Sequence, residues 1–126
     1  MYAFEIERPG TIADAVKALQ SDGAQALGGG QTLIPTLKAR LAAPDVLVSL
    51  SAIGEMQGVC LSDDGALCIG AATTHATVAR DAAAHFAGLA HLASHIGDPA
   101  VRNRGTIGGS LANNDPASCY PAAVLG

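Results

Sequence analysis

Two glycine-rich segments hold the residue types best suited to binding chemistry. The first, LGGGQT at residues 27–32, follows an expected strand and opens an expected helix. At such a junction main-chain N–H groups and the helix dipole can receive a phosphate, and glycine allows positive φ and close approach of a ligand. The segment is neither a P-loop, which needs G-x-x-x-x-G-K-[ST], nor a GxGxxG fingerprint. Taken alone, it is equally consistent with a tight turn.

The second segment, RGTIGGS at residues 104–110, again combines adjacent glycines with hydroxyl residues. Two such loops can converge on one pyrophosphate from opposite sides, each giving N–H donors. The hydroxyls of Thr32, Thr106 and Ser110 would complete the shell. Two unrelated turns are the alternative. Arg102 and Arg104 flank the loop and either supply positive potential or form a solvated pair.

The remaining polar residues give weaker signals. His91 and His95 have the i, i+4 spacing of zinc ligands but lack a third ligand, which favours exposed or capping histidines. Cys60 and Cys68 flank a hairpin signal, so a cross-strand disulfide is conceivable, although two reduced thiols are favoured in a cytoplasmic protein. The three cysteines cannot hold an iron–sulfur cluster by themselves. We predict no metal site and no catalytic acid, base or nucleophile in this chain.

Length, composition and charge limit which class of protein carries these loops. With 126 residues, 49% hydrophobic and 14% charged, the chain suits one domain or two small subdomains and not a disordered polymer. A net charge of −4 argues against nucleic-acid binding. We expect no membrane span and no signal peptide, hence a cytoplasmic protein. Aromatic residues are only 3%, so the core must pack by close approach of the backbones. A chain with such a core would be only marginally stable by itself.

Periodicity and caps predict two groups of elements. Strands at 2–7, 24–27 and 46–50, with helices at 12–21 and 33–42 between them, form a βαβαβ unit with a parallel sheet. A hairpin follows, with strands at 57–61 and 66–71. Beyond it we expect helices at 75–81 and 83–95, a helical turn within 98–105, a strand or loop at 106–110, and a helix starting at 116.

Three segments closely resemble the FAD-binding medium subunit of the molybdenum hydroxylase family, which includes carbon monoxide and xanthine dehydrogenases. They are LGGGQTLIP at 27–35, GAATTH at 70–75 and VRNRGTIGGSLANNDP at 101–116, in order along essentially the whole chain. The resemblance implies an α+β, p-cresol-methylhydroxylase-like FAD-binding fold. Its N-terminal α/β subdomain would span 1–54, and the first part of a second subdomain would span 55–126.

The resemblance also implies which residues bind the cofactor. Both glycine loops would hold the FAD pyrophosphate, with one further apolar contact from Ile96. Some relatives carry an acidic residue for the FAD ribose where this chain has Cys119, and Asp115 falls four residues too early to be its equivalent. The implied FAD-binding residues are Leu27, Gly28, Gly29, Gly30, Gln31, Thr32, Leu33, Ile96, Thr106, Ile107, Gly108, Gly109 and Ser110.

In that family the flavin subunit passes electrons from iron–sulfur clusters through FAD to a terminal acceptor. The partners implied are a molybdenum-cofactor large subunit, carrying molybdopterin, and an iron–sulfur small subunit. Flavin subunits of the family continue well past Gly126, so we expect an N-terminal fragment that is inactive alone and forms a homo-oligomer. The alternatives are an enolpyruvyl-reductase-like FAD oxidoreductase of the same fold, or a non-catalytic nucleotide-binding or assembly module.

Overall fold

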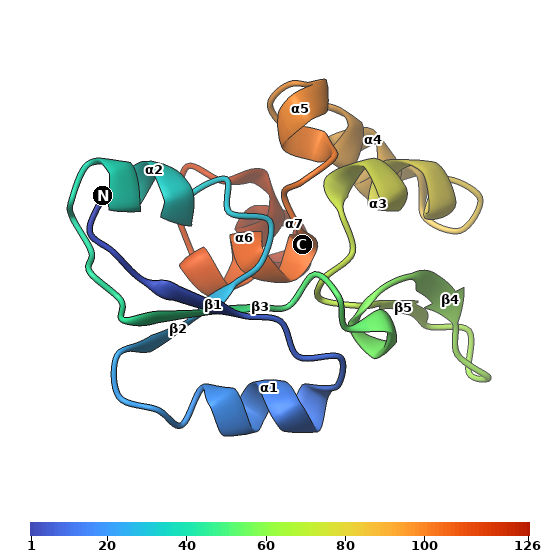
Figure 1. Ribbon diagram of the computed structural model, residues 1–126. Coiled ribbons are helices and arrows are strands. Elements are labelled where there is room, and N and C mark those ends of the chain that lie inside the picture. The colour runs from blue at the N-terminus through green and yellow to red at the C-terminus, as the bar shows by residue number, and fades with distance from the viewer.

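A parallel sheet carries the first glycine loop. The computed structural model describes residues 1–126, and in it β1 (Glu5–Glu7), β3 (Val46–Ser49) and β2 (Ala24–Leu27) lie in the order β1-β3-β2. Helices α1 (Ile12–Ala18) and α2 (Leu33–Lys38) lie on opposite sides of this sheet (Figure 1). The expected βαβαβ order is therefore confirmed.

The two faces of the central strand explain this arrangement. Successive residues of a strand point to opposite faces, and Leu47 and Val48 of β3 are both fully buried. Val48 packs in one small core with Ala15 of α1 and with Ile53. Thr11 caps α1, because its hydroxyl accepts a hydrogen bond from the Asp14 N–H at 3.1 Å.

Both helices of this unit are shorter than the sequence predicts. Helix α1 ends at Ala18 and not at residue 21, and α2 ends at Lys38 and not at residue 42. In α2 the reason is a left-handed residue, Arg40, at φ 58°. The next N–H, of Leu41, then donates to the Thr36 carbonyl at 3.1 Å, which is the Schellman ending of a helix.

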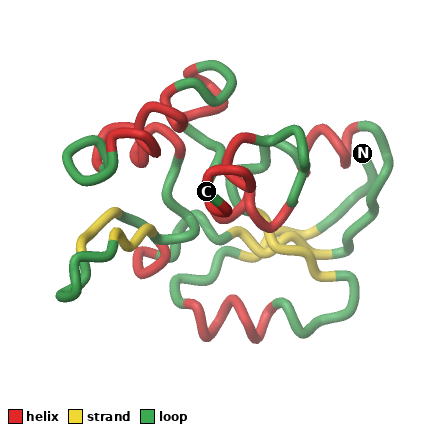
Figure 2. The backbone as a smooth tube through the Cα atoms, turned by 180° about the vertical axis from the view of Figure 1, so that it is seen from behind, coloured by secondary structure: helices red, strands yellow, loops and turns green.

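The second half begins with a turn of 3-10 helix at Gly54–Met56 and a hairpin, followed by five short helices (Figure 2). The hairpin strands pair antiparallel, with Val59 opposite Ile69. The boundary between subdomains at residues 54 and 55 stays a prediction. The elements after the 3-10 turn are β4 (Val59–Leu61), β5 (Leu67–Ile69), α3 (His75–Asp81), α4 (Ala87–Ser94), α5 (Pro99–Arg102), α6 (Ile107–Asn113) and α7 (Cys119–Leu125).

A second core joins helices α3, α4, α6 and α7, and half of its buried members are alanines. Its buried members are Val78, Ala82, Ala90, Ala93, Ile107 and Tyr120, from α3, α4, α6 and α7 and the turn after α3. Alanine at the α3–α4 contact lets the two helix backbones approach closely, as the low aromatic content predicts. Tyr120 is the one large side chain in this cluster and is fully buried.

Two expectations for this half are corrected. Residues 106–110 were expected to form a strand or loop, but they start helix α6, whose N-cap is Thr106 with its hydroxyl accepting from the Gly109 N–H at 3.2 Å. The helix expected at 83–95 begins only at Ala87, because the N–H groups of His85 and Phe86 both donate back to the Ala82 carbonyl. No helix is both long and apolar enough to span a bilayer.

Candidate functional site

The two glycine loops lie in direct backbone contact. A Cβ added to Gly29 would overlap the Arg104 carbonyl group, and one added to Gly28 would lie 3.0 Å from the Thr106 hydroxyl. The two loops therefore lie side by side, while their joint binding of one pyrophosphate stays a prediction. Glycine is needed at Gly29 and Gly30 for two different reasons. Gly30 takes a positive φ, at 74°, whereas at Gly29 a side chain would not fit where the two loops touch.

The first loop has unused hydrogen-bond donors. None of the main-chain N–H groups of residues 28–33 donates to an acceptor within the chain. The first paired N–H after the loop is that of Ile34, which donates to the Gly30 carbonyl at 3.0 Å. A run of free N–H groups at a strand-to-helix junction is a typical oxyanion cradle, because each dipole points its positive end toward the ligand.

Nearly all main-chain N–H groups of the second loop already donate to acceptors within the chain. The N–H groups of Ile107 and Gly108 donate to the Thr73 and Ala71 carbonyls, at 3.1 and 2.9 Å, and Ser110 N–H donates to the Thr106 carbonyl at 3.0 Å. This differs from the expectation that both loops present N–H groups to one ligand. The second loop is a platform for the first, and its hydroxyls and backbone surface are what remain available.

Residues 70–75 hold that platform in place, and the sequence analysis did not assign them to the site. The Thr73 hydroxyl donates to the Gly58 carbonyl at 3.1 Å and accepts from the Gly58 N–H at 2.9 Å. The His75 N–H donates to the Gly105 carbonyl at 3.0 Å. The segment thus connects the hairpin to the second loop. In the sequence, only its GAATTH pattern, one of the three segments that carry the family resemblance, indicated that it belongs to the site.

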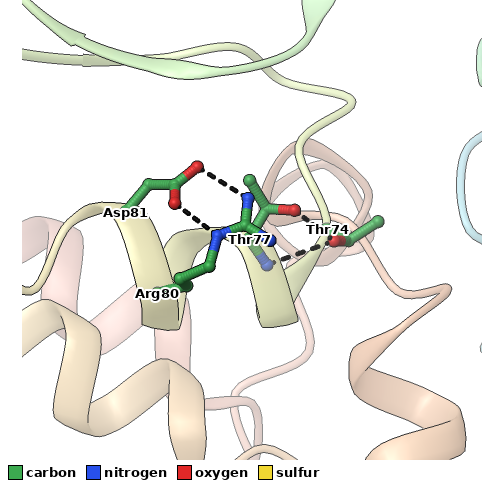
Figure 3. A network of polar contacts seen from close by, with 4 residues as sticks. All are labelled: Thr74, Thr77, Arg80 and Asp81. Atoms are coloured by element: carbon green, nitrogen blue, oxygen red, sulfur yellow. Dashed lines mark hydrogen bonds and ion pairs between the residues drawn. The ribbon is translucent and has the colours of Figure 1, made fainter.

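Thr74 sets the direction in which α3 leaves this segment (Figure 3). The Thr74 hydroxyl accepts from the Thr77 N–H at 3.3 Å and donates to the Thr77 hydroxyl at 3.0 Å, which caps the helix. Arg80 and Asp81, further along the helix, form an exposed ion pair of little energetic consequence. The cap fixes His75 as the first residue of α3, facing the second loop.

His75 is a buried neutral side chain beside the site. It exposes only 5% of its surface, and its ring lies 5.2 Å from the Tyr120 ring. Burial lowers the pKa of His75 and raises the pKa of Tyr120 to about 12, so both side chains stay uncharged at neutral pH. His75 Nδ1 and the Tyr120 hydroxyl are both buried without a hydrogen-bond partner.

Stability should therefore fall as the solution is acidified through the histidine range. The unfolded chain binds a proton at the ordinary histidine pKa, about 6.5, whereas the folded chain binds it only at lower pH. The free energy of unfolding consequently drops between pH 7 and the lowered pKa of His75, and levels off below it. Urea unfolding from pH 7.5 to 5 should show this slope, and the His75→Gln variant should show a shallower one; equal slopes would contradict the assignment.

A cavity of about 810 Å³ opens where the loops meet. All the predicted binding residues line it except Leu27 and Ile107, and Ile107 belongs instead to the second core. Ala71, Ala72, His75, Asn113, Asp115 and Ser118 line it without having been predicted.

No lysine or arginine lines this cavity. Arg102 instead donates to the carbonyls of Ile96 and Gly97, at 3.4 and 3.2 Å, and Arg104 is exposed. Cys119 is exposed and does not line the cavity, whereas Asp115 does. A negative ligand would therefore be held by main-chain dipoles and hydroxyls, with no cationic side chain beside it.

No group of three or more histidine, cysteine or acidic side chains lies close enough together to hold a metal ion. His91 and His95 are exposed neighbours with ring centroids 4.4 Å apart. His95 Nδ1 lies 2.8 Å from the His91 carbonyl oxygen, an interaction along one helix.

Comparison with known proteins gives a consistent set of relatives. The family profile described as "FAD binding domain in molybdopterin dehydrogenase" matches residues 2–126. The carbon monoxide dehydrogenase medium chain of Afipia carboxidovorans is 43% identical, over 97% of this chain and 43% of its own length. The glyceraldehyde dehydrogenase medium chain of Sulfolobus acidocaldarius is 39% identical, over 96% of this chain and 44% of its own.

Solved structures agree with these relatives. Carbon monoxide dehydrogenase from Hydrogenophaga pseudoflava superposes with a TM-score of 0.91 at 36% identity, covering 97% of this chain and 44% of that one. Quinoline 2-oxidoreductase from Pseudomonas putida 86 superposes with a TM-score of 0.89 at 35% identity, covering 95% and 43%. The chain thus spans less than half of the length of the relatives it matches.

Proposed function

Since the chain belongs to the family of FAD-binding domains in molybdopterin dehydrogenases, we propose that it holds the FAD of such an enzyme through its first glycine loop. The observation that carries this proposal is the run of unpaired N–H groups at residues 28–33 beside the cavity. A pyrophosphate supplies the negative oxygens that such donors lack within the chain.

The residues present fit this cofactor. The free N–H groups of residues 28–33 would bind the pyrophosphate, and the Thr32, Thr106 and Ser110 hydroxyls lie along the same cavity. Ile96 adds apolar lining. For the ribose hydroxyls we assign Asp115 and Ser118, which line the cavity, in place of the acidic residue absent at Cys119.

Within a full subunit, FAD supplies the electron-transfer chemistry, and this chain supplies its position. We propose that electrons reach the flavin from an iron–sulfur small subunit, after oxidation of substrate at a molybdenum-cofactor large subunit. This rests on relatives whose names describe medium chains and subunits of dehydrogenases. We place the complex in the cytoplasm, because all three cysteines are free thiols in the structure, as is usual for proteins of that compartment.

Purification of the full-length subunit from its native host tests the proposal. We expect a yellow protein with one FAD per subunit, together with iron and molybdenum in the partner subunits. Because no lysine or arginine lines the cavity, the dissociation constant for FAD should depend only weakly on salt between low and high ionic strength.

Each alternative predicts a different outcome of the same purification. A colourless protein that takes up no flavin would favour a nucleotide-binding or assembly module. A flavoprotein free of iron and molybdenum would favour an enolpyruvyl-reductase-like enzyme. A steep salt dependence that vanishes in the Arg102→Ala, Arg104→Ala double variant would overturn the backbone cradle and keep the FAD assignment.

A further inference from the structure

The β4–β5 hairpin places two cysteines directly opposite each other. Cys60 pairs with Cys68 in the ladder, and both thiols are exposed and free. On either side of them, the Ser62 N–H donates to the Ala66 carbonyl and the Gly70 N–H to the Gly58 carbonyl, both at 2.9 Å.

That register determines how far apart the two cysteines are. Antiparallel pairs alternate between hydrogen-bonded and non-hydrogen-bonded types, so the pair midway between these two bonded pairs is itself of the hydrogen-bonded type. Such residues have Cα atoms about 5.5 Å apart, within the range that disulfides adopt. Their side chains also project from the same face of the hairpin. The Cβ atoms of such a pair are about 5.5 Å apart, wider than the roughly 3.5–4.5 Å that a disulfide spans. A disulfide therefore requires a small movement of the two strands, and the resulting strain makes the bond readily reducible.

The base of this hairpin supports the second glycine loop. Gly58, two residues before Cys60, is hydrogen-bonded through both its N–H and its carbonyl to the Thr73 hydroxyl. Ala71, three residues after Cys68, accepts the Gly108 N–H at 2.9 Å. A cross-link between the strands would hold both attachments at a fixed separation.

We propose that Cys60 and Cys68 form a reversible dithiol–disulfide site, oxidised by a low-molecular-weight disulfide such as glutathione disulfide. One thiolate attacks glutathione disulfide, forms a mixed disulfide and releases one glutathione thiol. The second cysteine attacks the protein sulfur of that mixed disulfide and releases the second glutathione thiol. The two cysteines lose two electrons and their two protons, which reduce one glutathione disulfide to two glutathione thiols. The proposal does not depend on the FAD assignment.

Oxidation of this pair should change the stability of the fold little. The closed loop is short, so cross-linking removes few conformations from the unfolded chain, and strain in the folded state offsets that gain. We therefore expect the oxidised and reduced proteins to unfold at similar temperatures, and dithiothreitol to return the pair to two thiols.

The experiment equilibrates the full-length subunit, within its complex, in glutathione buffers of stepped redox potential. Remaining thiols are trapped by alkylation, and peptides are mapped by mass spectrometry. We expect a peptide pair linked through Cys60 and Cys68, lighter by about 2 Da than its reduced form, in the natural protein and in Cys119→Ser. The Cys60→Ser variant should instead retain a glutathione adduct on Cys68. The proposal is overturned by a disulfide that requires Cys119, or by Cys60 and Cys68 both staying unmodified in oxidised buffer.

Discussion

The Gly29→Val variant of the full-length subunit should lose its flavin while remaining folded. A Cβ at this position would overlap the Arg104 carbonyl and Gly105 of the second loop, so the two loops must move apart. The free N–H groups of residues 28–33 then no longer converge beside the cavity. Loss of two charge-assisted hydrogen bonds costs about 3–6 kcal/mol, which corresponds to a fall in FAD affinity of at least ~100-fold.

A valine at Gly54 provides the matched control, because a Cβ there meets no atom within 4 Å and its φ is not positive. Gly54→Val should retain FAD. Flavin content is measured by absorbance after gel filtration, and folding by far-ultraviolet circular dichroism and urea unfolding. A well-folded Gly29→Val protein with its normal flavin content would remove the site assignment.

Most of the correctly predicted elements depend on signals between residues that are close in sequence, such as helix caps and apolar periodicity. Thr11 and Thr74 cap helices α1 and α3, both through side-chain hydrogen bonds to the third residue on. The parallel βαβαβ order, expected from apolar periodicity and helix caps, is the order that the structure shows. These signals lie within a few residues of the element they specify, so one sequence is enough to find them.

What the sequence could not provide was the distribution of hydrogen bonds between distant segments. TIGGS looked like a strand or loop because adjacent glycines disfavour a helix. The segment forms α6 because the Thr73 and Ala71 carbonyls accept its first N–H groups from more than thirty residues away. For the same reason, the likeness between the two glycine loops concealed a difference in role: the first has free donors, and the second does not.

Two glycine-to-alanine changes should have opposite effects on stability. Both Gly88 and Gly108 lie in helices, where alanine is intrinsically better by up to about 1 kcal/mol. At Gly88 a Cβ makes only an ordinary contact, 3.5 Å from the Phe86 ring. At Gly108 it would lie 2.6 Å from both the Cβ and the carbonyl oxygen of Ala71. We expect Gly88→Ala to raise the free energy of unfolding by about 0.5 kcal/mol and Gly108→Ala to lower it by about 1–3 kcal/mol.

The Gly108 variant should also weaken FAD binding, by about tenfold. Relief of the overlap with Ala71 pushes the start of α6 away and strains the Gly108 N–H bond to the Ala71 carbonyl. Thr106, two residues earlier, packs against Gly28, so the shift reaches the first loop through the loop contact. A tenfold change corresponds to about 1.4 kcal/mol, within the cost of one distorted hydrogen bond. Urea unfolding and flavin fluorescence titration measure the two effects separately. If Gly108→Ala lost stability while binding FAD as tightly as the natural subunit, the second loop would not be the platform of the first.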